Sequence, residues 1–276
     1  MTRLDSRFSR NRFEYRSSSP LSDDDIQRFA PSIFAVDKHQ SRSSRYTHIP
    51  TGDVLRGLRK EGFSPFFVCQ TRSRDESKRE HTKHMVRLRH ANQIQAAEAN
   101  EIILVNSHDG ASSYQMLAGV FRFVCANGMV CGEVQGDIRV RHSGDILDNV
   151  ISGAYSVLES FEKADAQRDA MKSLRLNVGE QAAFAEAALA LKYDTEVLPA
   201  PITANQLLST RRAADQGSDL WTTFNRVQEN MLQGGLVGRN ATGKRTTTRR
   251  VSGIDQGIKL NRALWLLAES MRTLKA

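Results

Sequence analysis

The side chains with the clearest chemistry in this sequence are clustered cations. Seven Lys and Arg side chains lie between positions 72 and 89, and four more flank three threonines between positions 244 and 250. No acidic residue lies between Glu229 and Asp255. Because guanidinium groups and hydroxyls both donate to phosphate oxygens, these clusters predict contact with nucleic acid. The predicted nucleic-acid-binding residues are Arg72, Arg74, Lys78, Arg79, Lys83, Arg87, Arg89, Arg122, Arg139, Arg141, Lys244, Arg245, Arg249 and Arg250.

The overall charge agrees with that interpretation but leaves alternatives open. The formal net charge is +8 over 276 residues. A surplus of this size favours a polyanionic partner, with nucleic acid preferred over a membrane surface. The same charge also fits an anti-defence or host-interaction protein that docks on an acidic protein partner. Each cluster taken alone could equally be a solvated charged loop.

A second candidate site is the run Ser107-His108-Asp109-Gly110. These residue types could act as nucleophile, base and orienter, but adjacent side chains on an extended segment point to opposite faces and cannot form that relay. A tight turn in which Asp109 or Ser107 accepts from backbone N–H groups is the preferred interpretation. The alternative is a turn that presents His108 and a nest of N–H groups to a phosphate or a partner. A hairpin turn is predicted at Asn127-Gly128.

Metal and catalytic sites are not predicted. His81 and His84 stand three residues apart, but no further ligand follows at the usual spacing and the neighbouring cations would repel a metal ion. The sequence has no Walker A loop and no G-x-G-x-x-G, so no cofactor is expected. A metal-dependent nuclease built on His108, Asp109 and a carboxylate from elsewhere is the last alternative.

The elements that must position these residues change character along the chain. Residues 1–30 predict a basic arm and a short helix, 31–145 a sheet-rich half, and 146–276 a helical half that forms one compact domain with the sheet. Strands followed by helices indicate an α+β fold, with an antiparallel sheet packed by helices in the N-terminal half. In the strand at 85–90, Arg87 and Arg89 alternate with Val86 and Leu88, which predicts an exposed basic face.

The chain is expected in the cytoplasm. Its first residues are rich in Arg and Ser and have no apolar core of a secretory signal. No apolar run approaches the length of a membrane span. Three cysteines with no CxxC pair fit free thiols in a reducing compartment better than a disulfide framework.

Three blocks of this sequence resemble the plasmid- and prophage-encoded family called domain of unknown function 932. The first is Asn106 to Gly110, the second Phe121 to Gly128, and the third runs from Leu220-Trp221 to Glu229-Asn230. The resemblance extends from about Ser32 to the C-terminus. It implies a gene carried by a mobile genetic element beside DNA-maintenance and anti-defence functions, and it implies no particular chemistry.

Together these observations predict a nucleic-acid-binding protein without sequence specificity. Single-stranded DNA in mobile-element maintenance is the favoured target, by analogy in outline with single-strand annealing proteins. No membrane partner is expected, and an oligomer is possible.

Overall fold

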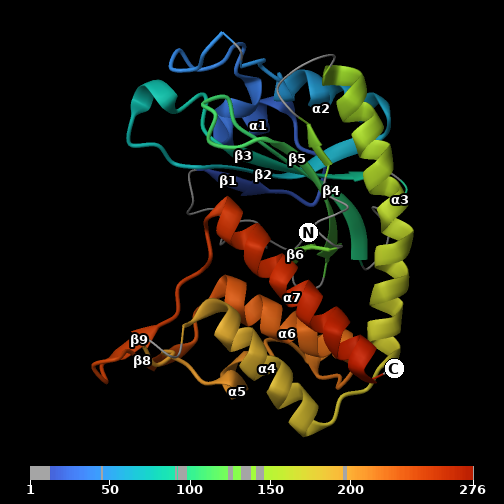
Figure 1. Cartoon of the computed structure of the whole chain (residues 1–276), viewed down its shortest axis with the longest axis vertical. Coiled ribbons are helices and arrows are strands. Elements are labelled where there is room, and N and C mark those ends of the chain that lie inside the picture. The colour runs from blue at the N-terminus through green and yellow to red at the C-terminus, as the bar shows by residue number, and fades with distance from the viewer. Residues whose placement is uncertain are drawn as a thin grey trace. The chain divides into compact units, whose positions relative to one another are not determined.

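The computed structural model describes residues 13–44, 46–90, 92, 98–123, 127–131, 138–140, 146–194 and 198–275. The chain forms two compact units. Unit 1 consists of residues Met1–Phe121 and Val134–Phe161, and unit 2 of residues Arg122–Glu133 and Glu162–Ala276. Figure 1 labels helices and strands of both units where there is room.

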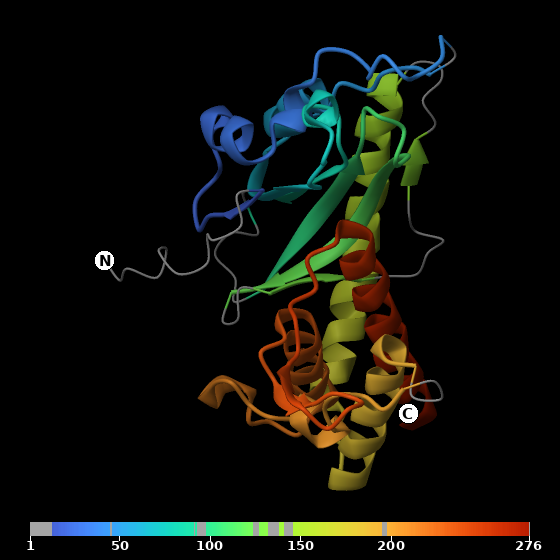
Figure 2. The same ribbon diagram turned by 90° about the vertical axis from the view of Figure 1, so that its left-hand side faces the viewer.

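Unit 1 is built on an antiparallel sheet. Strands β1 to β5 are neighbours in chain order, and β7 pairs antiparallel with β5. The register places Glu14 opposite Cys69 and shifts at a bulge between Pro65 and Phe67. The long strands bend along their length, as Figure 2 shows for β4 and β5. The strand bounds are β1 (Glu14–Arg16), β2 (Phe63–Gln70), β3 (His84–His90), β4 (Glu98–Asn106), β5 (Tyr114–Arg122) and β7 (Ile138–Val140).

Short helices cover one face of this sheet. Ser22 caps α1 (Asp23–Phe29) in a capping box with Asp25, and three acids in the first turn complement the helix dipole. The amphipathic α2 (Thr51–Lys60) packs against β2. The short helices η1 (Pro31–Phe34) and η2 (Glu76–Lys78) and the first part of α3 (Ile146–Ser173) complete the unit. Leu55, Leu58, Phe66, Val86 and Leu88 belong to its core.

Unit 2 is mostly helical. Two of its helices, α6 (Leu220–Gln233) and α7 (Ile254–Lys275), pack together through an aromatic core in which the ring centroids of Trp221 and Trp265 lie 6.3 Å apart. Both tryptophans are buried. The remaining elements are β6 (Asn127–Val130), the end of α3, α4 (Val178–Lys192), α5 (Ala204–Leu207), η5 (Ala213–Asp215), β8 (Val237–Arg239) and β9 (Arg245–Thr247).

The predicted α+β class is confirmed, with one local difference. Asn127 and Gly128 lie inside β6 and do not form the predicted turn. A type I′ turn needs a positive φ at both central residues, whereas residues of a β-strand have a negative φ. Within the part of the chain that is described, no helix is both long and apolar enough to cross a membrane. Cys69 and Cys131 form no disulfide.

Candidate nucleic-acid interface

The predicted cation cluster at 244–250 lies on and beside a two-stranded hairpin of unit 2. Strands β8 and β9 pair antiparallel, with Gly238 opposite Thr246 and Arg239 opposite Arg245. Asn240 orders the turn, because its Oδ1 accepts from the backbone N–H groups of Thr242 at 3.1 Å and Lys244 at 2.9 Å. The hairpin extends outward from the helices of its unit (Figure 1).

The hairpin carries its cations on exposed side chains. Lys244, Arg245, Arg249 and Arg250 are exposed, as predicted, and Arg239 joins them through the strand register. Arg239 donates from Nη1 to the Gly243 carbonyl oxygen at 2.9 Å, which holds its guanidinium beside the turn. These five side chains each carry a positive charge. Residues 230–254, which include the hairpin, contain no acidic residue that could neutralise them locally.

Backbone contacts fix the base of the hairpin. Gly235 N–H donates to the Thr248 carbonyl oxygen at 2.8 Å, and Thr248 N–H donates to the Leu236 carbonyl oxygen at 2.9 Å. The Arg239 N–H donates to the carbonyl oxygen of Pro201 at 2.9 Å. Thr248 is buried and its hydroxyl accepts from Leu236 N–H, so this threonine supports the hairpin from within. The cations therefore stand on an ordered base.

Gly238 provides a test of that base. A Cβ at this position would overlap the carbonyl oxygen of Pro201. We expect Gly238→Ala to displace β8 and break the Arg239–Pro201 hydrogen bond. Hydrogen exchange should then be faster in peptides covering 236–248 and unchanged in α7. Equal protection of the hairpin in the variant and the wild type would show that Gly238 is not required there.

The other predicted loop cluster lies in unit 1, between β2 and β3. Arg72, Arg74 and Arg79 are exposed, while Lys78 and Lys83 are half-buried. Lys78 pairs with Asp75 at 3.9 Å, and Arg72 lies 5.3 Å from the centre of the Phe13 ring. Exposed ion pairs of this kind contribute about 0–1 kcal/mol to folding stability. The segment is therefore a solvated surface on which an acidic side chain neutralises part of the positive charge.

The predicted basic face of β3 is wrong. Arg87 and Arg89 are buried, and both bind the carboxylate of buried Glu101 in β4, with N–O distances of 2.8 and 2.9 Å. The guanidinium of Arg89 also lies 3.8 Å from the centre of the Phe121 ring. These arginines face the interior because Glu101 neutralises them there, and they are not exposed phosphate ligands.

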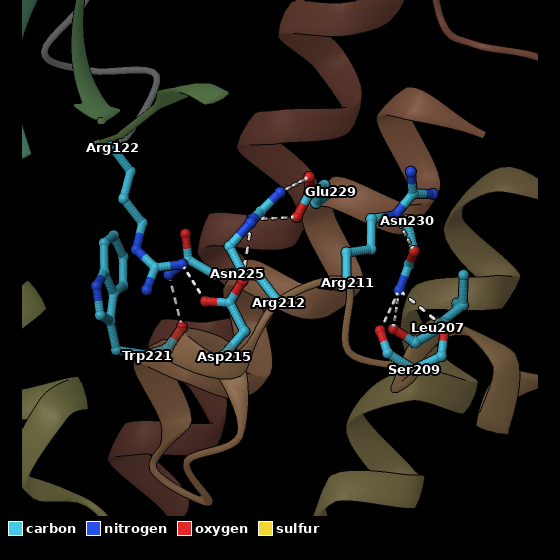
Figure 3. A network of polar contacts seen from close by, with 10 residues as sticks. All are labelled: Arg122, Leu207, Ser209, Arg211, Arg212, Asp215, Trp221, Asn225, Glu229 and Asn230. Atoms are coloured by element: carbon cyan, nitrogen blue, oxygen red, sulfur yellow. Dashed lines mark hydrogen bonds and ion pairs between the residues drawn. The ribbon is translucent and has the colours of Figure 1, made fainter. Parts of the chain in front are cut away.

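Arg122 is likewise an interior residue, in a polar network of unit 2 (Figure 3). Its Nη1 lies 2.5 Å from Oδ1 of Asp215, which also pairs with Arg212 at 3.0 Å. Arg212 in turn binds Glu229 with both terminal nitrogens. Trp221 and Asn225 lie beside this network (Figure 3). Arg122 is therefore an ion-paired residue of the core rather than a surface contact.

Two other predicted residues cannot be placed as side chains. Arg139 belongs to β7, where its backbone lies opposite Gln115, but its side chain falls outside the description. Arg141 lies outside the described residues altogether.

The turn after β4 has the capping role predicted for it. Asp109 Oδ1 accepts from Ala111 N–H at 2.9 Å, and Ser107 Oγ accepts from Ser112 N–H at 2.8 Å. Gly110 has a φ of +75°, a left-handed conformation that favours glycine. His108 is fully buried, so the alternative in which this turn presents its imidazole to a partner is wrong.

Five of the seven histidines gather in unit 1, a grouping that sequence spacing did not reveal. The ring centroids of His48 and His84 lie 4.5 and 5.2 Å from that of His108, and those of His39 and His81 lie 5.3 Å apart. Across the described ranges, no three His, Cys, Asp or Glu side chains are arranged to hold a metal ion.

Hydrogen bonds favour one tautomer of His84 in this group. Asn106 Nδ2 donates to Thr51 Oγ1 at 2.9 Å, so the Thr51 hydroxyl can donate to His84 Nε2, also at 2.9 Å. Nδ1 lies 2.9 Å from the Ser32 hydroxyl, which can donate or accept, and 3.2 Å from the Thr82 carbonyl oxygen, which can only accept. A neutral His84 with its proton on Nδ1 satisfies all of these contacts, and burial lowers its pKa to about 4.

Known proteins resemble the chain over nearly its whole length. It is 55% identical over 273 residues to UPF0380 protein YfjQ of Escherichia coli (strain K12), covering 99% of both chains. It is 54% identical to UPF0380 protein YafZ of the same organism, again covering 99% of both chains. No solved structure gives a significant match. The family model described as Domain of unknown function (DUF932) matches residues 38–265, and the chain therefore belongs to this family.

Proposed function

We propose that this protein binds nucleic acid through its phosphate groups, without base specificity, and that the β8–β9 hairpin is the principal contact. The observation that carries the proposal is the set of five exposed cations on an ordered ribbon whose segment contains no acid. Lys and Arg on such a surface attract a polyanion from a distance and displace its counterions on contact.

The choice of phosphate over base edges follows from the residue types. Arg and Lys dominate the hairpin, and Thr242 and Thr247 add exposed hydroxyls. These are the groups that commonly contact phosphates. Neither β8 nor β9 contains an aromatic residue for base stacking, so affinity should vary little with sequence. Single-stranded DNA of a plasmid or prophage is the proposed target, in line with the family resemblance. Its affinity is to be compared with that of duplex DNA of the same length.

Binding of a fluorescent oligonucleotide tests the proposal. Fluorescence anisotropy with single-stranded DNA, at 50 and 200 mM salt, should show affinity falling steeply as salt rises. For single strands the slope of log K against log salt is about −0.7 per phosphate contact, so four or five contacts predict a slope near −3. Absent binding at the lower salt concentration would overturn the proposal.

A matched pair of variants localises the interface. Lys244→Gln combined with Arg249→Gln removes two hairpin charges, and Lys163→Gln combined with Lys172→Gln removes two exposed charges from the part of α3 in the same unit. We expect the hairpin pair to reduce the salt slope by about 1.4 and the helix pair to leave it unchanged. Equal losses from both pairs would show that net charge, and not the hairpin, determines binding.

A further inference from the structure

Two arginines of the hairpin are placed to act on one ligand group. We propose that Arg239 and Arg245 form a clamp for a single phosphodiester group of the nucleic-acid backbone. This inference rests on the proposed function and adds the mode of recognition to it.

The strand register carries the geometry. Arg239 and Arg245 are directly opposite each other, and the other pairs of the ribbon alternate between its two faces. Residues directly opposite on antiparallel strands have their Cβ atoms about 4.5–5.5 Å apart. Both side chains are exposed on the same face of the ribbon. Two guanidinium groups can therefore reach the same point in solvent above the ribbon.

The energetics of the bare pair favour an anion between the two guanidinium groups. Like charges directly opposite on neighbouring strands destabilise a hairpin. No acid of residues 230–254 relieves this pair, and among the described residues neither arginine has a carboxylate partner. The backbone bonds of Thr248 with Gly235 and Leu236 keep the two sides of the hairpin paired despite the repulsion, and the bond from Arg239 N–H to Pro201 anchors β8. An anion bound between the two arginines would remove it.

A phosphodiester is the anion that fits between two guanidinium groups. Each guanidinium offers parallel N–H donors, and a phosphodiester offers two non-bridging oxygens that share one negative charge. Arg239 has one terminal nitrogen engaged by Gly243, which leaves its other nitrogens to donate. Lys244, a point charge at the turn, would contact a neighbouring phosphate.

A double-mutant cycle tests the clamp. Affinity for the single-stranded oligonucleotide is measured at constant salt for the wild type, Arg239→Gln, Arg245→Gln and the double variant. Loss of a charge-assisted hydrogen-bonded contact predicts about a tenfold loss for each single variant. If both arginines hold one phosphate, the double variant should also lose about tenfold. A product of the two single losses, about a hundredfold, would mean separate phosphates and would overturn the clamp.

A second ligand separates failure of the clamp from failure of the proposed function. Titration with inorganic phosphate, followed by the NMR signals of the arginine Nε–Hε groups, should shift Arg239 and Arg245 together. A wild type that binds phosphate at this pair but no oligonucleotide would keep the anion clamp and overturn the nucleic-acid function. A wild type that binds neither ligand would overturn both. Lys163→Gln with Lys172→Gln serves as the control and should change neither measurement.

Discussion

Replacing Glu101 by glutamine is expected to destabilise unit 1 by about 3–5 kcal/mol, the range found when one partner is removed from a buried ion pair. The carboxylate is fully buried and bridges Arg87 and Arg89, which are 5% and 1% exposed. Glutamine keeps the volume but removes the charge, so two guanidinium groups lose the anion that accepts from both. The loss should be visible as a lower urea midpoint by circular dichroism at pH 7.

An exposed ion pair gives the matched control. Asp53 pairs with Arg56 on the surface of α2, with both side chains about half exposed. Asp53→Asn is expected to change stability by less than about 1 kcal/mol. Hydrogen exchange should lose protection in peptides of β3 and β4 for Glu101→Gln only. Equal urea midpoints for the two variants would contradict the structural role assigned to Glu101.

The same arginines show where sequence reasoning failed and why. Alternation of Arg87 and Arg89 with apolar residues correctly predicted a strand. A repeat of two residues identifies a strand, but it does not tell whether solvent or another part of the protein covers its polar face. The polar face was assigned to solvent because arginine is rarely buried without a partner. That partner, Glu101, lies on the next strand, and only the register of β3 with β4 brings it opposite.

Other features could be predicted because their signals are local. The turn at Ser107 to Gly110 and the acid-free segment of the hairpin are both defined by neighbouring residues. The α+β class followed from the change in hydrophobic period along the chain. Arg239 was missed since it stands alone in the sequence, and pairing of β8 with β9 places it beside Arg245. The histidine group was missed for the same reason.

Lowering the pH from about 6.5 to 4 is expected to destabilise unit 1 through His84. Burial is the largest cause of its low pKa, and nearby His48 lowers that pKa further. In the folded chain the pKa is about 4, whereas the unfolded histidine titrates near 6.5. Between these values the unfolded chain binds a proton that the folded chain does not. The contribution of His84 is therefore full above pH 6.5, falls as the pH is lowered and is lost below about 4.

The hydrogen bonds explain why protonation is unfavourable. A proton on Nε2 would face the Thr51 hydroxyl, which accepts from Asn106 and can donate to that nitrogen only while the imidazole is neutral. The hydroxyl would have to turn away in a site with no water access, since His84 and Thr51 are both fully buried. A pKa difference of about 2.5 units corresponds to about 3 kcal/mol in stability at 1.36 kcal/mol per unit. This is an effect comparable to the loss of Glu101.

Urea denaturation at intervals from pH 7.5 to 4 would measure this contribution, provided that His84 is separated from the other histidines. His84→Gln cannot titrate, so its stability should fall less steeply across that interval than that of the wild type. His90→Gln is the control for loss of a histidine from the same strand, because His90 is only half-buried. If His84→Gln shows the same pH dependence as the wild type, His84 does not carry the linkage. If the slope of stability against pH is reduced in His84→Gln alone, the acid sensitivity belongs to the hydrogen bonds that link Asn106, Thr51 and His84. These bonds would then give a physical reason for an asparagine directly before the Ser107 turn.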